Sequence, residues 1–472
     1  MEKEELVFVP SPGAGHLVST IELAKRLIDR HDRLSITVLC IKPPSILNAG
    51  YIDSLASSAP WIRWIELPSV DPPSPETCKL PFSFISRFIE GHRPHVKQAV
   101  TQLMASQRQS RIAGLVLDLF CSPLIDVAAE LGIPSYMFFT SPAAMLGLML
   151  HFPTLNSQTT TDLKDSVELI IPSYVNPVSP RFLPVSLWIR KEDAYIRWLY
   201  HCRPFREAKG IIVNSFSELE SHAINSFSDG RTPPVYPVGP LIDLESRIHS
   251  PSNRIRRDKI VKWLDDQPPS SVVLLCFGSM GGFGAPQVKE IAVGLERSDV
   301  RFLWSLRQPS EVMMGPPRDY TSVELGEILP NGFLDRTEGR GLICGWIPQV
   351  EVLGHPAIGG FISHCGWNSI LESLWFGVPV ATWPLYAEQH LNAFEMVRDL
   401  GLALEIRLDY RNGDDLVSAE EVERSVRSLM DGDSEVRRRV WDMREKSRAT
   451  VVDGGSSFSS LGFLIDDLMA KN

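Results

Sequence analysis

The sequence lacks several features that would by themselves place it in a specialised class. Its 7 Cys are an odd number with no CxxC pair, which argues against a zinc site or a disulfide framework and fits a reducing compartment. It has no uninterrupted apolar run long enough to cross a bilayer, and its charged start is unlike a signal peptide. A net charge of -10 lacks the basic surface of a nucleic-acid-binding protein. These absences predict a cytoplasmic protein that binds no nucleic acid and has no transmembrane segment.

The composition is otherwise that of an ordinary globular protein. The hydrophobic fraction is 44% and the charged fraction is 22% of the 472 residues. At about 150 residues per domain, this length allows roughly two to four domains. Cores of that size need neither disulfides nor metals for stability.

The first half of the chain alternates short apolar runs with helical patterns. The expected strands are 6–9, 35–40, 112–117 and 135–139, and the expected helices are 17–30 and 123–131. Runs that are apolar on both faces are typical of buried parallel strands. Strand–helix–strand alternation therefore predicts a doubly wound α/β sheet.

The second half repeats this alternation after a proline cluster and a polar stretch. The stretch 245–257 is the predicted interdomain linker. The expected strands beyond it are 271–276, 301–306, 359–363 and 378–382, and the expected helices are 286–297 and 368–376. The pattern predicts two α/β halves that face each other across a cleft. The final helical segment, 457–470, could pack on either half.

The first loop that could carry a catalytic residue is 11–16, between the first strand and the first helix. Gly13 and Gly15 resemble a dinucleotide fingerprint, but Val18 occupies the third glycine position and no P-loop lysine follows. The loop instead presents His16, a side chain suited to proton transfer near neutral pH. The alternative is a histidine that caps or packs the helix.

Asp118 ends a buried apolar run. A buried aspartate costs free energy unless it is paired, and parallel strands bring their carboxyl ends together. Asp118 could therefore bond one ring nitrogen of His16 and fix its tautomer. The alternative is an N-cap for the helix that follows.

A glycine-rich loop, 277–282, follows a strand of the second half. It is not a nucleophile elbow, because Phe277 stands where GxSxG needs glycine. Its backbone N–H groups and the Ser279 hydroxyl suit a phosphate, although it could also be a plain glycine loop. A second motif, Asp431-Gly432-Asp433, matches the DxD of metal-dependent sugar transferases. It lies between helical segments and is predicted to be a solvated turn.

Polar and aromatic residues are densest between 346 and 389. His364 to Ser369 span a strand-to-helix junction, where a helix N-terminus suits a diphosphate. Glu372 lies one turn beyond Ser369, and Trp346 offers a flat face for a base. Together they predict a site for a nucleotide-sugar donor.

The stretch 346–389 resembles, without a gap, the signature box of plant UDP-dependent glycosyltransferases of glycosyltransferase family 1. Shorter resemblances extend over nearly the whole chain, at 12–17, 117–120, 210–216 and 263–268. The segments 182–184 and 277–281 are similar to the branch that glucosylates flavonoids, other phenolics and some terpenoids.

The resemblance implies a GT-B fold and a set of donor contacts. It implies an N-terminal acceptor-binding domain (1–244), the linker (245–257), a C-terminal UDP-sugar-binding domain (258–455) and a C-terminal helix (456–472) that packs back on the N-terminal domain. It assigns Trp346 to the uracil, Gln349 and Glu372 to the ribose, Ser279, His364, Asn368 and Ser369 to the diphosphate, and Trp367, Glu388 and Gln389 to the sugar.

The last position of the box bears on the sugar. Relatives with Gln there generally favour UDP-glucose, whereas His goes with galactose. The ungapped register from Trp346 places Gln389, not His390, at this position. Trp367 also fits glucose better than the Arg of glucuronosyl enzymes.

The resemblance implies an inverting hexosyltransferase with no cofactor and no obligatory metal. His16 takes the proton of an acceptor hydroxyl, Asp118 orients the imidazole, and the product is a β-glucoside. We expect a monomer whose cleft closes for catalysis and whose acceptor is a small hydrophobic plant metabolite. The expected acceptor pocket is apolar, with Phe82, Phe120, Phe139, Met145, Leu183, Trp188, Trp198, Phe283 and Tyr386.

Three alternatives remain open from sequence. One is a catalytically silent relative that binds UDP-sugar or acceptor, which the intact His16 and Asp118 argue against. Another is the same type of enzyme with a different UDP-sugar. The third is an NAD-linked oxidoreductase, which the incomplete glycine fingerprint disfavours.

Overall fold

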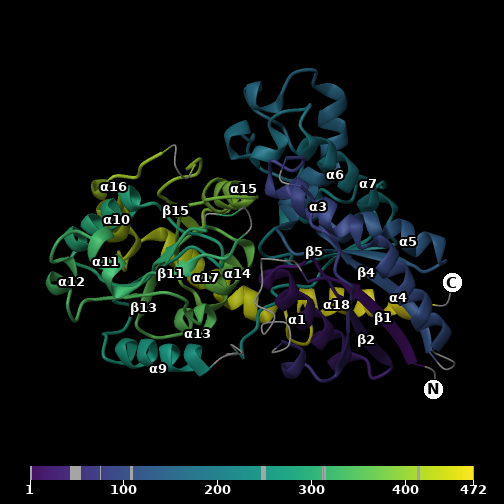
Figure 1. Ribbon diagram of the computed structural model, residues 1–472, viewed down its shortest axis with the longest axis horizontal. Helices are drawn as coiled ribbons and strands as arrows, with labels where there is room; N and C mark the ends of the chain where they lie inside the picture. The colour runs from purple at the N-terminus through teal and green to yellow at the C-terminus, as the bar shows by residue number, and fades with distance from the viewer. Residues whose placement is uncertain are drawn as a thin grey trace. The chain divides into compact units, whose positions relative to one another are not determined.

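The computed structural model describes residues 3–42, 55–74, 76–106, 110–245, 251–310, 312, 315–411 and 415–470. The chain divides into two compact units. Unit 1 comprises Met1–Ile242 and Ala449–Asn472, and unit 2 comprises Asp243–Arg448. Each unit is built on its own parallel sheet with helices on both faces (Figure 1). The doubly wound α/β architecture predicted for both halves is therefore confirmed.

Unit 1 is built on a seven-stranded parallel sheet in the described part of the chain. Its strands run in the spatial order β3 (Ile62–Glu66), β2 (Leu34–Cys40), β1 (Lys3–Val9), β4 (Ser110–Asp118), β5 (Ser135–Phe139), β6 (Gly210–Val213) and β7 (Val235–Pro237). Strands β1 and β5 are buried along nearly their whole length, which explains the apolar runs 6–9 and 136–139 within them.

Two helices from opposite ends of the chain cover one face of this sheet, α1 (Ala14–Arg30) and α18 (Ser456–Met469). Both contribute apolar side chains to a core that includes Phe8 and Phe138 of the sheet. The Tyr136 hydroxyl donates a hydrogen bond to Asp467 Oδ2 at 2.7 Å. The last helix thus belongs structurally to unit 1.

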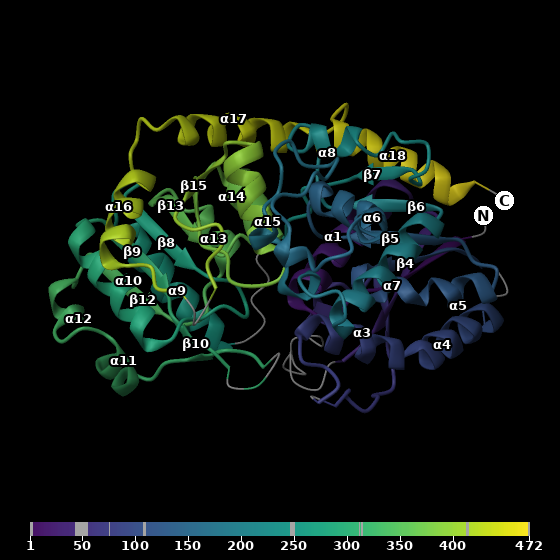
Figure 2. The ribbon, with the colours of Figure 1, turned by 90° about the horizontal axis from the view of Figure 1, so that it is seen from above.

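Most other helices of unit 1 lie on the opposite face of the sheet (Figure 2). They are α3 (Pro81–Gly91), α4 (Arg93–Ser106), α5 (Ile125–Glu130), α6 (Ala143–Gln158) and α7 (Asp193–Glu207). Between β4 and α5 runs a short 3-10 helix, η1 (Leu119–Leu124), which packs against both α3 and α7.

Unit 2 is built on a six-stranded parallel sheet among its described residues. The spatial order is β12 (Gly341–Cys344), β9 (Arg301–Ser305), β8 (Val272–Cys276), β13 (Ile358–Ser363), β14 (Val380–Thr382) and β15 (Ala403–Glu405). A separate antiparallel pair, β10 (Arg307–Gln308) and β11 (Arg318–Asp319), directly follows β9. The helices are α9 (Pro251–Asp265), α10 (Ala285–Ser298), α11 (Ser322–Ile328), α12 (Phe333–Arg336), α13 (Gln349–Leu353), α14 (Trp367–Phe376), α15 (Gln389–Phe394), α16 (Ala419–Leu429) and α17 (Glu435–Ala449).

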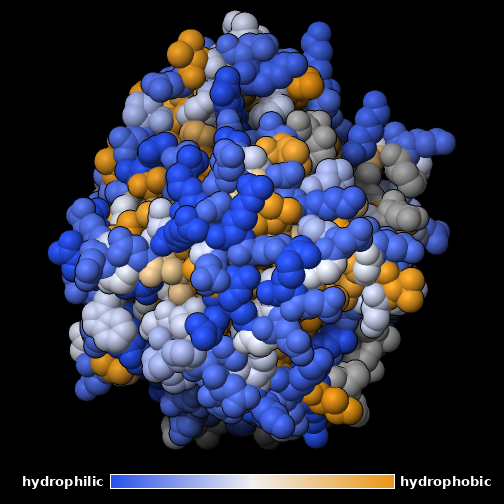
Figure 3. Space-filling view, turned by 90° about the vertical axis from the view of Figure 1, so that its left-hand side faces the viewer, coloured by the Kyte–Doolittle hydropathy of each residue, from blue (hydrophilic) through white to orange (hydrophobic). Residues whose placement is uncertain are grey.

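The outer helices of unit 2 are amphipathic. Helix α16 begins with a capping box between Ser418 and Glu421 and buries Val422 and Val426 against the core. The side of unit 2 that carries α11 and α12 is hydrophilic over most of its area, with apolar residues dispersed on it (Figure 3). No helix in the described ranges reaches the length and apolarity that a membrane span requires.

The strand order reverses once in each sheet. In unit 1 the reversal lies between β1 and β4, and in unit 2 it lies between β8 and β13. Loops that follow the two strands at such a switch point diverge, and ligands of open α/β sheets bind there. The fold therefore points to two loop pairs: the segments after β1 and β4 in unit 1, and those after β8 and β13 in unit 2.

Sequence patterns did not predict several elements, among them the long helices α4, α6, α7, α9 and α17 and short strands such as β12. Strand β12 has four residues, none fully buried, and its apolar run of Leu342, Ile343 and Cys344 is too short to mark a central strand. In the predicted linker, residues 246–250 lie outside the described residues, and from Pro251 onward the chain forms α9. The polar composition of 251–257 thus belongs to a surface helix rather than to a loop.

Candidate active site

The switch point of unit 1 brings His16 and Asp118 together. His16 is the third residue of α1, after β1, and Asp118 is the last residue of β4, so the pairing of these strands joins them. His16 Nδ1 donates to Asp118 Oδ2 at 2.9 Å. The Asp118 side chain is 1% exposed and that of His16 is 29% exposed. The carboxylate is thus shielded from solvent, while the imidazole remains accessible.

Two hydroxyl groups complete the surroundings of this pair. Ser11 Oγ donates to Asp118 Oδ1, so both carboxylate oxygens are bonded. Thr140 Oγ1, just beyond β5, lies 3.1 Å from His16 Nδ1. Because Nδ1 carries the proton toward Asp118, the lone pair of the neutral ring is on Nε2. A histidine held in this tautomer is arranged as a general base.

The sequence analysis did not predict a role for Ser11 or Thr140, although the position of each at a strand end could have indicated it. Ser11 lies inside the loop that was singled out for His16, and Thr140 follows a predicted strand. The carboxyl ends of β1, β4 and β5 lie side by side, because these strands are neighbours in the sheet. A search of all strand ends for hydroxyl groups would have found the two residues.

A cluster of aromatic rings lies next to the imidazole in unit 1. Phe120 meets His16 edge to face at 6.2 Å between ring centroids, and Phe82 lies 5.3 Å from Phe120. Trp198 stacks on Phe82 at 4.3 Å with an interplanar angle of 9°. Three of the residues expected to contact an acceptor thus form one cluster next to His16.

A fully buried histidine, His201, supports this cluster. Its ring nitrogens bond to Ser86 Oγ at 2.8 Å and to Ser122 Oγ at 2.9 Å, and its ring packs against Phe82 and Phe120. Burial lowers the pKa of His201 to about 3, so the ring is neutral. His201 was not predicted from sequence, because nothing in the pattern of α7 distinguishes it from a packing residue.

The other expected acceptor residues are distributed differently. Phe139, Met145 and Leu183 are at most 2% exposed and pack inside unit 1. Phe283 is 1% exposed and packs against Phe277 and Trp383 in the core of unit 2.

Trp188 and Tyr386 retain accessible ring surface. Trp188 is half-buried and donates to the Pro180 carbonyl at 3.1 Å, whereas Tyr386 is exposed. Phe82 and Phe120 are also half-buried. Core packing accounts for the apolar character of the fully buried residues without any ligand.

The switch point of unit 2 lies between Gly278 and His364. His364 follows β13 and is 6% exposed, and its Nδ1 has no hydrogen-bond partner among the described residues. Burial lowers its pKa to about 4, so the ring is neutral at pH 7. Gly278 has φ +76, and a Cβ there would lie 2.4 Å from His364 Nε2. Only glycine therefore allows the 277–282 loop to lie this close to the imidazole.

The start of α14 gathers the polar residues predicted to hold a nucleotide. Its N-cap is Gly366, so no side chain caps this end. Gln349 Nε2 donates to Ser369 Oγ at 2.9 Å and to Glu372 Oε2 at 2.7 Å. Burial raises the pKa of Glu372 to about 7, while the Gln349 hydrogen bond opposes the shift. Trp346, half-buried, lies at the end of the loop after β12.

The loop before α15 is closed by the side chain of Gln389. Its Oε1 accepts from the backbone N–H groups of Leu385 and Tyr386, each at 3.0 Å. The next residue, His390, is fully buried, and its Nε2 bonds to the Tyr410 carbonyl at 2.7 Å. Gln389 thus faces the loop that also carries Glu388, whereas His390 belongs to the core.

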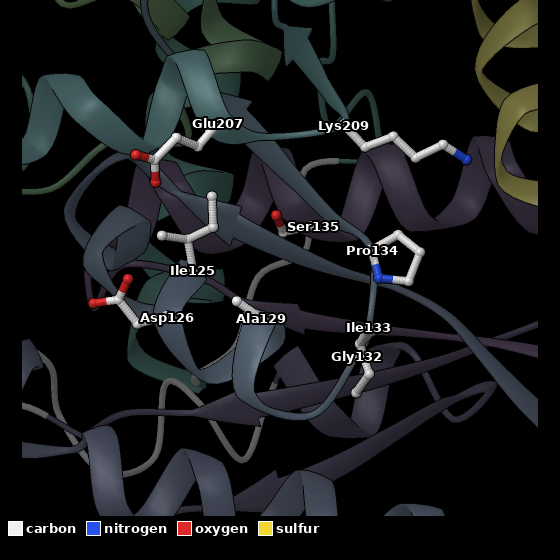
Figure 4. A pocket seen from close by; sticks show the side chains of 9 residues that line it. All are labelled: Ile125, Asp126, Ala129, Gly132, Ile133, Pro134, Ser135, Glu207 and Lys209. Atoms are coloured by element: carbon white, nitrogen blue, oxygen red, sulfur yellow. The ribbon is translucent and has the colours of Figure 1, made fainter. Parts of the chain in front are cut away.

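A separate cavity of about 420 Å³ opens on unit 1 (Figure 4). Its walls include Ser135, the first residue of β5, so it lies at the amino end of the sheet, whereas Asp118 lies at the carboxyl end. The charged groups at its rim already have partners: Lys209 pairs with Asp467, and Asp126 pairs with Arg203. This cavity is therefore not part of the His16 site.

The described residues contain no metal-binding cluster, and the DxD motif is part of a turn. No group of three or more His, Cys, Asp or Glu side chains in the described part of the chain is arranged to hold a metal ion. Asp431 and Asp433 lie in an exposed turn between α16 and α17, as predicted.

The chain is similar in sequence to plant glycosyltransferases over nearly its whole length. Residues 234–434 match the family model "UDP-glucoronosyl and UDP-glucosyl transferase". The "UDP-glycosyltransferase 71K2" of Pyrus communis is 55% identical over 100% of this chain and 99% of its own length. The "Flavonol 3-O-glucosyltransferase UGT71C4" of Arabidopsis thaliana is 46% identical over 99% of this chain and 98% of its own.

A solved structure shows the same architecture. The crystal structure of Medicago truncatula UGT71G1 complexed with UDP-glucose has a TM-score of 0.90 and 47% sequence identity to this chain. The match covers 99% of both chains.

Proposed function

The chain belongs to the plant UDP-glycosyltransferases of glycosyltransferase family 1, with their GT-B fold of two Rossmann-like domains, and from this we propose that it is an inverting glucosyltransferase. It transfers glucose from UDP-glucose to a hydroxyl of a small hydrophobic phenolic compound of the flavonoid type. The observation that carries this proposal is the His16–Asp118 pair, with Nδ1 fixed at 2.9 Å from the buried carboxylate.

His16 acts as the general base. Its Nε2 takes the proton from the acceptor hydroxyl as the oxygen attacks the anomeric carbon from the side opposite UDP. The Asp118 carboxylate stabilises the imidazolium that forms, and Ser11 holds the carboxylate in place. A positioned base of this kind contributes on the order of 10²–10⁴-fold to the rate.

The switch point of unit 2 holds the donor. Trp346 stacks on the uracil, and Gln349 and Glu372 bind the ribose. Diphosphate oxygens accept hydrogen bonds at the start of α14, where Ser369 adds a hydroxyl and His364 a neutral imidazole N–H. These donors stabilise the departing UDP without an obligatory metal ion. The proposed diphosphate contacts are completed by Ser279 and Asn368.

The proposed sugar contacts are Trp367, Glu388 and Gln389. Gln389 Oε1 already accepts two backbone hydrogen bonds, so Gln389 contacts a sugar hydroxyl through its amide nitrogen. The buried position of His390 argues against that residue as the sugar contact. Support for glucose also comes from the Medicago truncatula relative, which was crystallised with UDP-glucose.

Unit 1 supplies the acceptor side. The rings of Phe82 and Phe120, next to His16, provide an apolar surface on which a flat phenolic ring can stack. A flavonol is the preferred candidate, because one of the similar proteins is named for glucosylation of flavonols.

The test is turnover with product analysis. The wild-type protein is incubated with UDP-glucose, UDP-galactose or UDP-glucuronic acid and a panel of flavonols, simpler phenols and terpenoid alcohols. We expect UDP-glucose to be consumed fastest, a product mass increased by one hexose, and the large anomeric proton coupling of a β-glucoside. Turnover should persist in EDTA. An α-glucoside would contradict inversion, and UDP-sugar binding without any product would identify a silent binding protein.

A further inference from the structure

Arg307 lies between the sheet of unit 2 and the glycine-rich loop. It is the first residue of β10, two residues beyond the last residue of β9, and it pairs with Asp319 of β11. Strand β9 is the neighbour of β8, and the loop after β8 carries Ser279. The short β10–β11 pair therefore begins next to the loop proposed to bind the diphosphate.

Both the side chain and the backbone of Arg307 contact this loop. Nη1 donates to the Ser279 carbonyl at 3.0 Å, and Nη2 donates to the Pro317 carbonyl at 2.6 Å. A Cβ at Gly282 would lie 2.8 Å from the Arg307 carbonyl oxygen, so glycine permits the close approach. The Arg307 side chain is 16% exposed. The guanidinium thus ties β11 and the glycine-rich loop together from a largely buried position.

The peptide between Ser279 and Met280 has its orientation fixed by Arg307, through the 3.0 Å hydrogen bond to the Ser279 carbonyl. In a trans peptide the N–H points away from the carbonyl, so a carbonyl directed at Arg307 turns the Met280 N–H to the other side. Arg307 therefore determines the direction in which the backbone N–H of Met280 points.

We propose that Arg307 is a positioning residue for the donor, which fixes the Ser279–Met280 peptide and so places the loop that binds the diphosphate. The inference rests on the proposed donor site. Arg307 acts through the backbone of the glycine-rich loop, and its charge also favours an anion at that loop. It does not act on the uracil or the ribose, which are assigned to Trp346, Gln349 and Glu372.

The proposal predicts a loss of affinity confined to ligands that contain phosphate. The dissociation constants of UDP and of uridine are measured by calorimetry or competition for the full-length wild type, Arg307→Gln, Arg307→Lys and Arg318→Gln. Arg318 is the matched control, because it lies on β11, pairs with Glu324 at the surface, and loses the same charge on substitution.

Arg307→Gln should weaken UDP binding about tenfold, the usual worth of a hydrogen bond from a charged group, and leave uridine binding unchanged. Arg307→Lys keeps the charge without the two-pronged contact and should fall between Arg307→Gln and the wild type. Arg318→Gln should match the wild type for both ligands.

Different results overturn different claims. Wild-type affinity for UDP in Arg307→Gln would overturn the positioning role, and so would an equal loss of UDP and uridine affinity. If Arg307→Gln does not fold, wild-type UDP affinity in Arg307→Lys would still overturn it. Absence of UDP binding by the wild type would instead refute the donor site itself.

Discussion

Units 1 and 2 place their candidate residues at the same topological position, but these residues are much farther apart in the sequence of unit 1 than in that of unit 2. In unit 1, His16 and Asp118 are 102 residues apart, and Thr140 is a further strand away. In unit 2, Gln349 and Ser369 are separated by 20 residues, and most of the donor site lies in one stretch. Residues that lie in one stretch can be recognised as a sequence motif. Residues from distant strand ends can be recognised as one site only when the fold is known.

The two sites also differ in their electrostatics. Unit 1 holds an ion-pairing geometry, with a buried carboxylate bonded to an accessible imidazole. In unit 2, burial lowers the pKa of His364 to about 4 and raises that of Glu372 to about 7. The first arrangement suits proton transfer, and the second suits hydrogen bonding to a ligand that brings its own charge. We therefore expect substitutions in unit 1 to affect turnover and those in unit 2 to affect nucleotide binding.

The largest effect in this comparison is expected for Asp118→Asn. The amide N–H can donate a hydrogen bond to Nδ1, which favours the tautomer with its proton on Nε2, and a ring in that state cannot act as the base. We expect kcat to fall on the order of 10²–10⁴-fold, with UDP affinity unchanged. Steady-state kinetics and UDP calorimetry measure the two quantities. An unchanged kcat would remove Asp118 from the mechanism.

Glu372→Gln probes the nucleotide side. The substitution replaces charge-assisted hydrogen bonds to the ribose with neutral ones, so we expect about 10- to 100-fold weaker UDP binding and little change in kcat at saturating donor. Calorimetry and a donor titration of the rate give both numbers. A fall in kcat with unchanged UDP affinity would contradict the division between the units.

Ser11→Ala tests the support of the carboxylate. Loss of the hydroxyl leaves Asp118 Oδ1 buried without its donor, and we expect kcat to fall about tenfold. Thr140→Val is the comparison, because Thr140 contacts His16 rather than Asp118. The role assigned to Ser11 would be untenable if Ser11→Ala retained full kcat across the pH range.

The smallest effect concerns stability in acid. The pKa of His201 is about 3 in the folded protein, below its ordinary value of about 6.5, so the unfolded chain binds more protons between these values. Its contribution to stability is therefore complete above about pH 6.5 and is lost as the pH falls toward 3, at up to roughly 1.4 kcal/mol per pH unit.

Urea unfolding at several pH values in this window compares the wild type with His201→Gln. The variant keeps hydrogen-bonding groups but cannot be protonated, so the free energy of unfolding should depend less steeply on pH. Identical slopes would show that His201 is not the group that titrates.

Much of the fold could be predicted from the sequence, for reasons that particular elements make clear. Strands β1, β4, β5, β8 and β13 each contain a short apolar run of the kind that is typical of a buried parallel strand. Strand β12 could not be predicted, because it is half-buried and short. Residues 251–257 form part of α9 rather than the predicted linker, because a surface helix and a loop can have the same polar composition.

Candidate site residues could be predicted where a polar or titratable side chain follows a predicted strand. His16, Asp118 and the residues at the start of α14 are of this kind, because such side chains have few structural roles at a strand end. Phe139 and Phe283 show the limit, because an aromatic residue has the same pattern in a core as in a pocket. Ser11, Thr140, His201 and Arg307 act through partners that are distant in sequence, so no local pattern marks them.

The most direct test of the account is the His16→Ala variant, examined for UDP binding and turnover in the same preparation. We predict UDP affinity equal to that of the wild type, together with a loss of glucosyl transfer to an ordinary phenol on the order of 10²–10⁴-fold. Near-full turnover by this variant would contradict the assignment of the base. Loss of UDP affinity together with turnover would contradict the division of labour between the two units.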